Sequence, residues 1–143
     1  MKKENPKEKI IQHIEEKLVR KKSYNICLAT VAKELKVSKR TIYEIFESKD
    51  EIFEHIIQRF YDDVKKFQSK IITDFKNNEI EFYEGIEEFL IRIFENKHLA
   101  LSKIFDKFPK HSEKFRSDTL DFLETLIEIA KKRNIIKQKR TYL

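Results

Sequence analysis

Apolar residues recur at three- and four-residue steps along most of the chain, which is the spacing of one face of an α-helix. The first stripe predicts a helix over residues 6–21, and two shorter stripes predict helices over residues 28–36 and around Ile42, Ile45 and Phe46. Two helices of about eight residues bury too little surface to be stable alone, so this pair needs the first helix as a partner. The pattern therefore predicts a three-helix unit at the N-terminus.

A firm helix start follows this unit. In Ser48-Lys49-Asp50-Glu51 the Ser48 hydroxyl can accept the amide of Glu51, while the Glu51 carboxylate reaches back to the amide of Ser48. From there apolar residues continue at helical steps, which predicts one long helix over residues 49–74.

Three further helices are expected after a break at residues 76–78. The first runs from about residue 82 to residues 96–97, the next covers residues 99–108 before Pro109 interrupts it, and the last covers residues 112–133. The buried face of the first of these is expected to hold Phe82, Ile86, Phe89, Leu90 and Ile93. The whole chain is therefore predicted to be all-α, a three-helix head followed by a small helical bundle.

Composition limits the classes of protein that fit. In 143 residues, 39% are charged and no apolar run approaches 18 residues, which argues against a membrane protein. The N-terminal cations are not followed by an apolar segment, so no secretory signal is expected and the predicted location is the cytoplasm. Cys27 stands alone and precedes an apolar helix start, which predicts a small buried side chain rather than a redox site.

The net charge of +6 is unevenly distributed. Residues 1–50 hold 13 Lys or Arg against 8 Asp or Glu, residues 51–130 hold 12 against 17, and residues 131–143 hold 6 against none. A basic first third is what contact with phosphates requires, and an acidic middle should face away from nucleic acid. The basic tail has two interpretations, a solvated end or a further contact with nucleic acid.

Several short motifs fall on the two short helices and on the start of the long one. They are Val31-Ala32, Val37-Ser38, Thr41-Ile42-Tyr43, Phe46 and Ser48-Lys49-Asp50-Glu51-Ile52-Phe53. In these motifs and their spacing the chain resembles the TetR family of bacterial transcriptional regulators. The resemblance implies a helix-turn-helix DNA-binding domain over residues 1–48 and a helical effector-binding and dimerisation domain over residues 49–143.

The resemblance also implies which residues contact DNA. By position, these roles fall on Ser38, Lys39, Arg40, Thr41, Tyr43 and Lys49. The chain departs from the family at other positions, with Lys22, Lys36 and Arg40 where glycine is usual and Ile26 and Cys27 where a threonine pair is usual, which leaves Asn25 as the best cap. Lys36 is the most awkward change, because a left-handed backbone costs a residue with a Cβ about 1 kcal/mol relative to glycine. The turn is therefore expected to be locally reshaped.

Phenylalanine dominates the expected interior of the bundle. The inward side chains that could line a pocket are Phe60, Phe67, Phe82, Phe89, Phe105 and Phe122. Such a stripe is either ordinary core or the lining of a pocket for a small apolar ligand. The family resemblance favours weighing the second interpretation, and both stay open here.

Enzymatic chemistry is not expected. The adjacent carboxylates Asp62-Asp63 and Glu87-Glu88 diverge on a helix, and a chain with one glycine cannot build a glycine-rich phosphate loop. His98 and His111 give only weak support for a metal, so neither a metal nor a cofactor is predicted.

The chain is therefore predicted to be a repressor that binds double-stranded operator DNA as a homodimer and is released by a small apolar effector. The alternative is a helical protein-interaction module with weak or lost DNA binding. Family members usually continue with two more helices that form the dimer interface. Either this is a naturally short member, or the protein continues past Leu143, or dimerisation uses the helix over residues 112–133.

Overall fold

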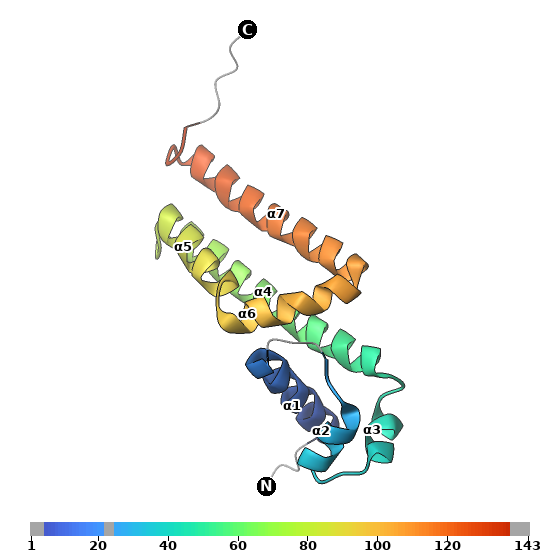
Figure 1. The fold of residues 1–143 in the computed structure, drawn as a ribbon. Helices are drawn as coiled ribbons and strands as arrows, with labels where there is room; N and C mark the ends of the chain where they lie inside the picture. Colours follow the sequence, from blue (N-terminus) through green and yellow to red (C-terminus); the bar gives the residue numbers. More distant parts are fainter. Residues whose placement is uncertain (1–4, 22–24, 138–143) are drawn as a thin grey trace.

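The computed structural model describes residues 5–21 and 25–137, and the all-α prediction is confirmed there. Three helices form a head at one end of the molecule, and the remaining elements form a body at the other (Figure 1). The head consists of α1 (Pro6–Lys21), α2 (Leu28–Glu34) and α3 (Lys39–Ile45). The body consists of α4 (Lys49–Lys76), α5 (Phe82–Ile93), α6 (Asn96–Ser102), the 3-10 helix η1 (Lys103–Lys107) and α7 (Pro109–Lys132).

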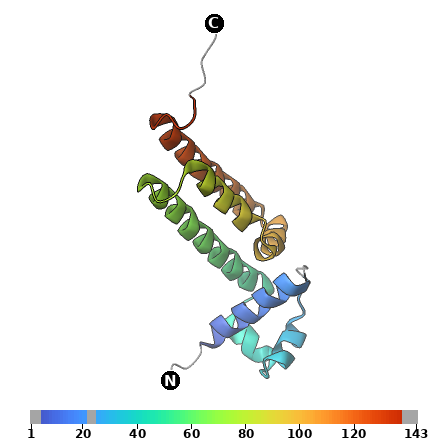
Figure 2. The same cartoon turned by 90° about the vertical axis from the view of Figure 1, so that its left-hand side faces the viewer.

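The long helix α4 connects the two parts. It starts beside α3 and runs the length of the body, where α5 and α7 lie along it, as the two perpendicular views in Figures 1 and 2 show. The C-terminal end of α7 lies beside the C-terminal end of α4. There the Arg133 guanidinium donates to the carbonyl oxygens of Phe75 and Lys76, each at 2.8 Å. The predicted long helix therefore forms the spine of the molecule.

Four predicted boundaries were wrong. Helix α2 ends at Glu34 rather than at Lys36, and α5 ends at Ile93 rather than at residues 96–97. Helix α6 begins at Asn96 rather than at Leu99, and α7 begins at Pro109 rather than at Ser112. Proline suits a first helical position, because the amide that it lacks has no intrahelical acceptor there. Pro109 therefore starts the last helix as well as ending the previous segment.

Helices α2, α4 and α7 end in the same way. The residue after each C-cap has a positive φ: Lys36 at 56°, Asn78 at 60° and Asn134 at 58°. The next amide along donates back to the last turn, from Val37 to Ala32 at 3.0 Å and from Ile135 to Ala130 at 2.9 Å. Each end is thus a Schellman motif, in which a left-handed residue satisfies the last helical carbonyls.

Two apolar clusters form the interior. The head cluster includes Ile11 and Phe46 from the head and continues through Phe53 and Phe60 of α4 to Phe105 of η1. Apolar packing is therefore continuous across the predicted boundary between residues 48 and 49, and the division into two domains stays a prediction.

The body cluster lies further along α4. Its buried members are Ile71, Phe75, Phe82, Phe89, Phe122, Leu126 and Ala130. Phe67 is partly buried and packs against both clusters, so it marks the place where they meet.

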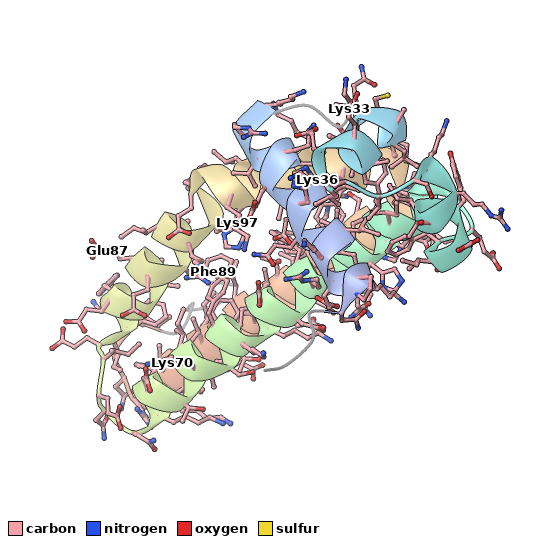
Figure 3. All side chains as sticks on the ribbon, turned by 90° about the horizontal axis from the view of Figure 1, so that it is seen from below. Lys33, Lys36, Lys70, Glu87, Phe89 and Lys97 are labelled. Atoms are coloured by element: carbon pink, nitrogen blue, oxygen red, sulfur yellow. The ribbon has the colours of Figure 1, made fainter. Side chains whose placement is uncertain are left out.

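The outer face of α5 differs from the prediction. Phe89 is buried, whereas Leu90, predicted to be inward, is 45% exposed. In Figure 3 Phe89 lies between α5 and α4, while Glu87 projects away from the body. Successive helical residues are about 100° apart, so Leu90 falls on the outer side of α5 together with Tyr83, Ile91 and Phe94.

Candidate nucleic-acid interface

Helix α3, which carries most of the predicted DNA-contact residues, begins at a well-formed cap. Ser38 is the N-cap residue, and its Oγ accepts the Thr41 amide at 3.0 Å while lying 2.8 Å from Thr41 Oγ1. Ile42, fully buried, fixes one side of the helix against the head cluster. The opposite side of α3 must therefore face solvent.

That solvent face holds the predicted contact residues. Lys39 and Arg40 are exposed, Tyr43 is 48% exposed, and the Lys39 ammonium lies 5.8 Å from the centre of the Tyr43 ring. Arg40 is 88% exposed, and its Nε donates to a Glu44 carboxylate oxygen at 3.0 Å. An exposed pair of this kind stabilises a helix by only about 0.3–0.5 kcal/mol, so Arg40 can exchange Glu44 for another partner at little cost.

The turn before α3 keeps a standard geometry despite the missing glycine. Lys36 takes the left-handed conformation itself, with its amide donating to the Lys33 carbonyl at 3.2 Å and the Val37 amide donating to the Ala32 carbonyl at 3.0 Å. The prediction that this turn is reshaped was therefore wrong. Lysine bears the cost of the conformation instead.

The start of α4 is the second predicted contact. Ser48 Oγ accepts the Glu51 amide at 3.2 Å, as expected, but the Glu51 carboxylate accepts the amide of Glu47 at 2.6 Å rather than that of Ser48. The capping exchange is thus displaced by one residue. Lys49 is half-buried, and its ammonium lies 5.9 Å from the centre of the Phe53 ring. Because the aliphatic part of Lys49 packs against the protein, its ammonium group stays near the N-terminus of α4. The ammonium group and the positive end of the helix dipole both favour an anion at this place.

The sequence did not reveal how α1 is fastened to α2. The Lys17 side chain is 5% exposed, and its ammonium donates to Oε1 of Glu34. The other carboxylate oxygen of Glu34 lies 3.4 Å from His13 Nε2. The Lys17 hydrogen bond holds the pKa of Glu34 below its ordinary value. This ion pair holds α1 against α2, and α2 in turn packs against α3.

Cys27 also departs from its prediction. It is exposed and occupies the N-cap position of α2, where the structure gives it no side-chain cap bond. Asn25 is therefore not the N-cap residue of α2. The Thr30 side chain, followed by nearby backbone amides, lowers the pKa of the Cys27 thiol.

A second ionic connection joins head and body. Glu15 of α1 is buried, with one carboxylate oxygen 3.3 Å from the Lys97 ammonium of α6 and the other 3.9 Å from Arg59 of α4. These residues line a cleft of about 360 Å³, beside which Figure 3 shows Lys97. The orientation of α1 is thus set by charges from two body helices as well as by apolar packing.

The six phenylalanines proposed as a pocket are divided between the two clusters. Ring centres lie 5.5 Å apart for Phe60 and Phe105 and 4.9 Å apart for Phe89 and Phe122, which are ordinary aromatic packing distances. Phe67 lines a cleft of about 310 Å³ between α4 and α5, and Phe122 lines one of about 260 Å³ between α4 and α7. A single pocket shared by all six stays a prediction.

The described residues show neither a metal cluster nor a membrane-spanning helix. Residues 5–21 and 25–137 contain no cluster of three or more His, Cys, Asp or Glu side chains placed to bind a metal ion. None of the helices in this part of the chain is both long enough and apolar enough to cross a membrane.

Comparison with known proteins places the similarity on the same segment. Residues 17–56 match the family model for bacterial regulatory proteins of the tetR family. The chain is also 23% identical, over 95 residues, to the uncharacterized HTH-type transcriptional regulator YvaF of Bacillus subtilis (strain 168). That alignment covers 66% of this chain and 48% of the relative, so the chain spans about half of the relative's length. No solved structure matches significantly.

Proposed function

We propose that the protein is a transcriptional regulator of the TetR type that binds double-stranded operator DNA, a proposal supported by the match of residues 17–56 to the family model. The observation behind this proposal is the solvent face of α3, where Lys39, Arg40 and Tyr43 project from a helix held by Ile42. An exposed cationic helix of this kind fits a major groove.

Ser38, Thr41 and Lys49 complete the proposed interface. The first two lie at the N-terminal end of α3, and Lys49 lies at the capped start of α4. Hydroxyls, lysine ammonium groups and helix N-termini are frequent partners of phosphate oxygens, so these residues position the head while the face of α3 reads bases.

We further propose that the protein acts as a repressor and that a small apolar ligand in the body releases the DNA. The support is the density of aromatic rings along α4, together with its continuous path from the head to the body. A ligand acts this way only if it binds the DNA-competent and released forms differently. A typical coupling of about 1–3 kcal/mol weakens operator binding roughly 5- to 150-fold.

Reading a palindrome requires two heads, so the proposed assembly is a homodimer. Its recognition helices should lie about 34–36 Å apart, which is one turn of DNA. Light scattering of the purified protein tests the assembly, and a mobility-shift assay on the DNA upstream of its own gene tests binding. Apolar compounds that raise the melting temperature are then added to the shift assay, where an effector should release the DNA.

One observation favours a second candidate, a protein-interaction module. On the outer face of α5, Tyr83 and Phe94 are each 68% exposed and Ile91 is 59% exposed. Contiguous exposed apolar side chains often mark a site for another protein. A monomer that fails to shift any DNA would favour this candidate, whereas a dimer that shifts upstream DNA would favour the regulator.

A further inference from the structure

Lys36 holds a backbone conformation that its side chain disfavours. Its φ of 56° lies in the left-handed region, where a Cβ crowds the backbone and glycine is favoured. The two equivalent helix ends in the described chain use Asn78 and Asn134, and asparagine tolerates this region better than lysine does. A glycine at position 36 would therefore form the same turn with less strain.

The ammonium group of Lys36 has no partner within the described residues. The side chain is exposed, and within residues 5–21 and 25–137 it makes no hydrogen bond, ion pair or ring contact. The nearest carboxylate in sequence, Glu34, is occupied by Lys17 and lies close to His13. The strain at Lys36 is thus not compensated by an internal contact of its charge.

The position of Lys36 places this free charge beside the proposed interface. It lies in the turn between α2 and α3, three residues before Lys39, the first residue of the recognition helix. Figure 3, which views the molecule from the head end, shows Lys36 there and Lys33 on the last turn of α2. Lys33 is likewise exposed.

We propose that Lys36 binds a DNA phosphate at the edge of the groove that α3 enters, and that the strained turn serves to hold a cation at this point. The inference rests on the proposed function, since it adds a contact to the same interface. A phosphate contact carries no sequence information, so Lys36 strengthens binding to all DNA and fixes the position of the head.

The size of the contribution follows from counterion release. Each neutralised phosphate adds about −0.9 to the slope of log affinity against log salt. Through each such contact, a fourfold rise in salt concentration lowers DNA affinity about 3.5-fold. A variant that loses the contact should lack this part of the salt dependence in each head that is bound.

The decisive variant is Lys36→Gly, which relieves the strain and removes the charge together. Its thermal unfolding midpoint, measured without DNA, should rise by about 2–5 °C. Its affinity for operator and for scrambled DNA, measured by fluorescence anisotropy across a salt series, should fall by the same factor, with a slope shallower by about 0.9 per head. A gain in stability with a loss of binding is the result expected.

Two matched variants separate charge from backbone. Lys36→Arg keeps the cation and should keep the salt slope of the wild type. Lys66→Ala removes one exposed cation from α4, away from the head, and should leave the slope unchanged. Equal slopes for the wild type and Lys36→Gly would overturn the inference while leaving DNA binding intact. A wild-type protein that binds no DNA would overturn both the inference and the proposed function.

Discussion

In the head, short helices with defined caps place particular polar groups on a surface. In the body, long helices pack phenyl rings against one another, and such apolar packing can be achieved by many arrangements of the rings. Ser38 and Ser48 each accept an amide at the start of a helix, and Lys17 locks α1 to α2 through Glu34. Each of these contacts requires a side chain with a particular hydrogen-bonding or charged group at one position. In the body cluster, by contrast, Phe89 meets Phe122 through apolar contact alone.

This difference explains why the two regions are unequally informative about function. A cap or an exposed cation is tied to a geometry, so its sequence position indicates a role. A buried ring indicates only that the position is inside, and a ligand pocket and a filled core use the same residues. The outer surfaces also differ, since α3 presents Lys39 and Arg40 while α5 presents Glu87 beside an apolar stripe.

The largest expected effects come from truncating one buried ring in each region. Phe46→Ala and Phe89→Ala should each lower the free energy of unfolding by about 3–5 kcal/mol, because both rings are at most 3% exposed. Only Phe46→Ala should also weaken DNA binding when both variants are compared below their melting temperatures, since Phe46 supports α3. Urea unfolding and DNA titration at low temperature measure the two effects. Equal losses of DNA affinity in the two variants would remove the proposed distinction between head and body.

A smaller effect is expected at the start of α4. Lys49→Ala should reduce the salt slope of DNA binding by about 0.9 per head and weaken all sequences about equally. The matched change Lys114→Ala removes a cation from α7 and should change neither quantity. An unchanged slope together with an altered base preference would show that Lys49 does not contact a phosphate.

The smallest effect concerns acid stability of the head. Because Lys17 lowers the pKa of Glu34 in the folded protein, ionised Glu34 contributes stability above its ordinary pKa of 4.5, and this contribution is lost as the pH falls through the lowered value. Glu34→Gln should therefore be less stable than the wild type at pH 7, with a difference that shrinks below pH 4.5. Glu87→Gln, on the exposed face of α5, serves as the control. A wild-type advantage that persisted at low pH would assign the effect to something other than this ionisation.

Much of the head could be predicted from the sequence because its signals are local. The bounds of α1, the cap at Ser48 and the inward position of Ile42 follow from helical spacing and capping chemistry. Non-local features were missed: the Lys17 and Glu34 pair joins residues 17 positions apart, and nothing in the local pattern identifies it.

In the body, periodicity predicted the helices better than their inner faces. Phe89 and Leu90 are adjacent, and the helical spacing of apolar residues is compatible with either one at the edge of the buried face. Packing against α4 buries Phe89 and leaves Leu90 exposed. Lys36 was recognised as unfavourable, but sequence alone could not decide between a reshaped turn and a left-handed lysine. The hydrogen bonds of the Schellman motif decide it, because they require the positive φ.

The central claim is that the solvent face of α3 reads DNA bases, and selection of binding sites from random DNA tests it most directly. The wild type should enrich two related half-sites about one helical turn apart. Arg40→Ala, which removes the most exposed cation of α3, should cost about 1–3 kcal/mol on that site and relax one base position in each half. Enrichment of no motif by the wild type, or of an identical motif with equal affinity by the variant, would contradict the account.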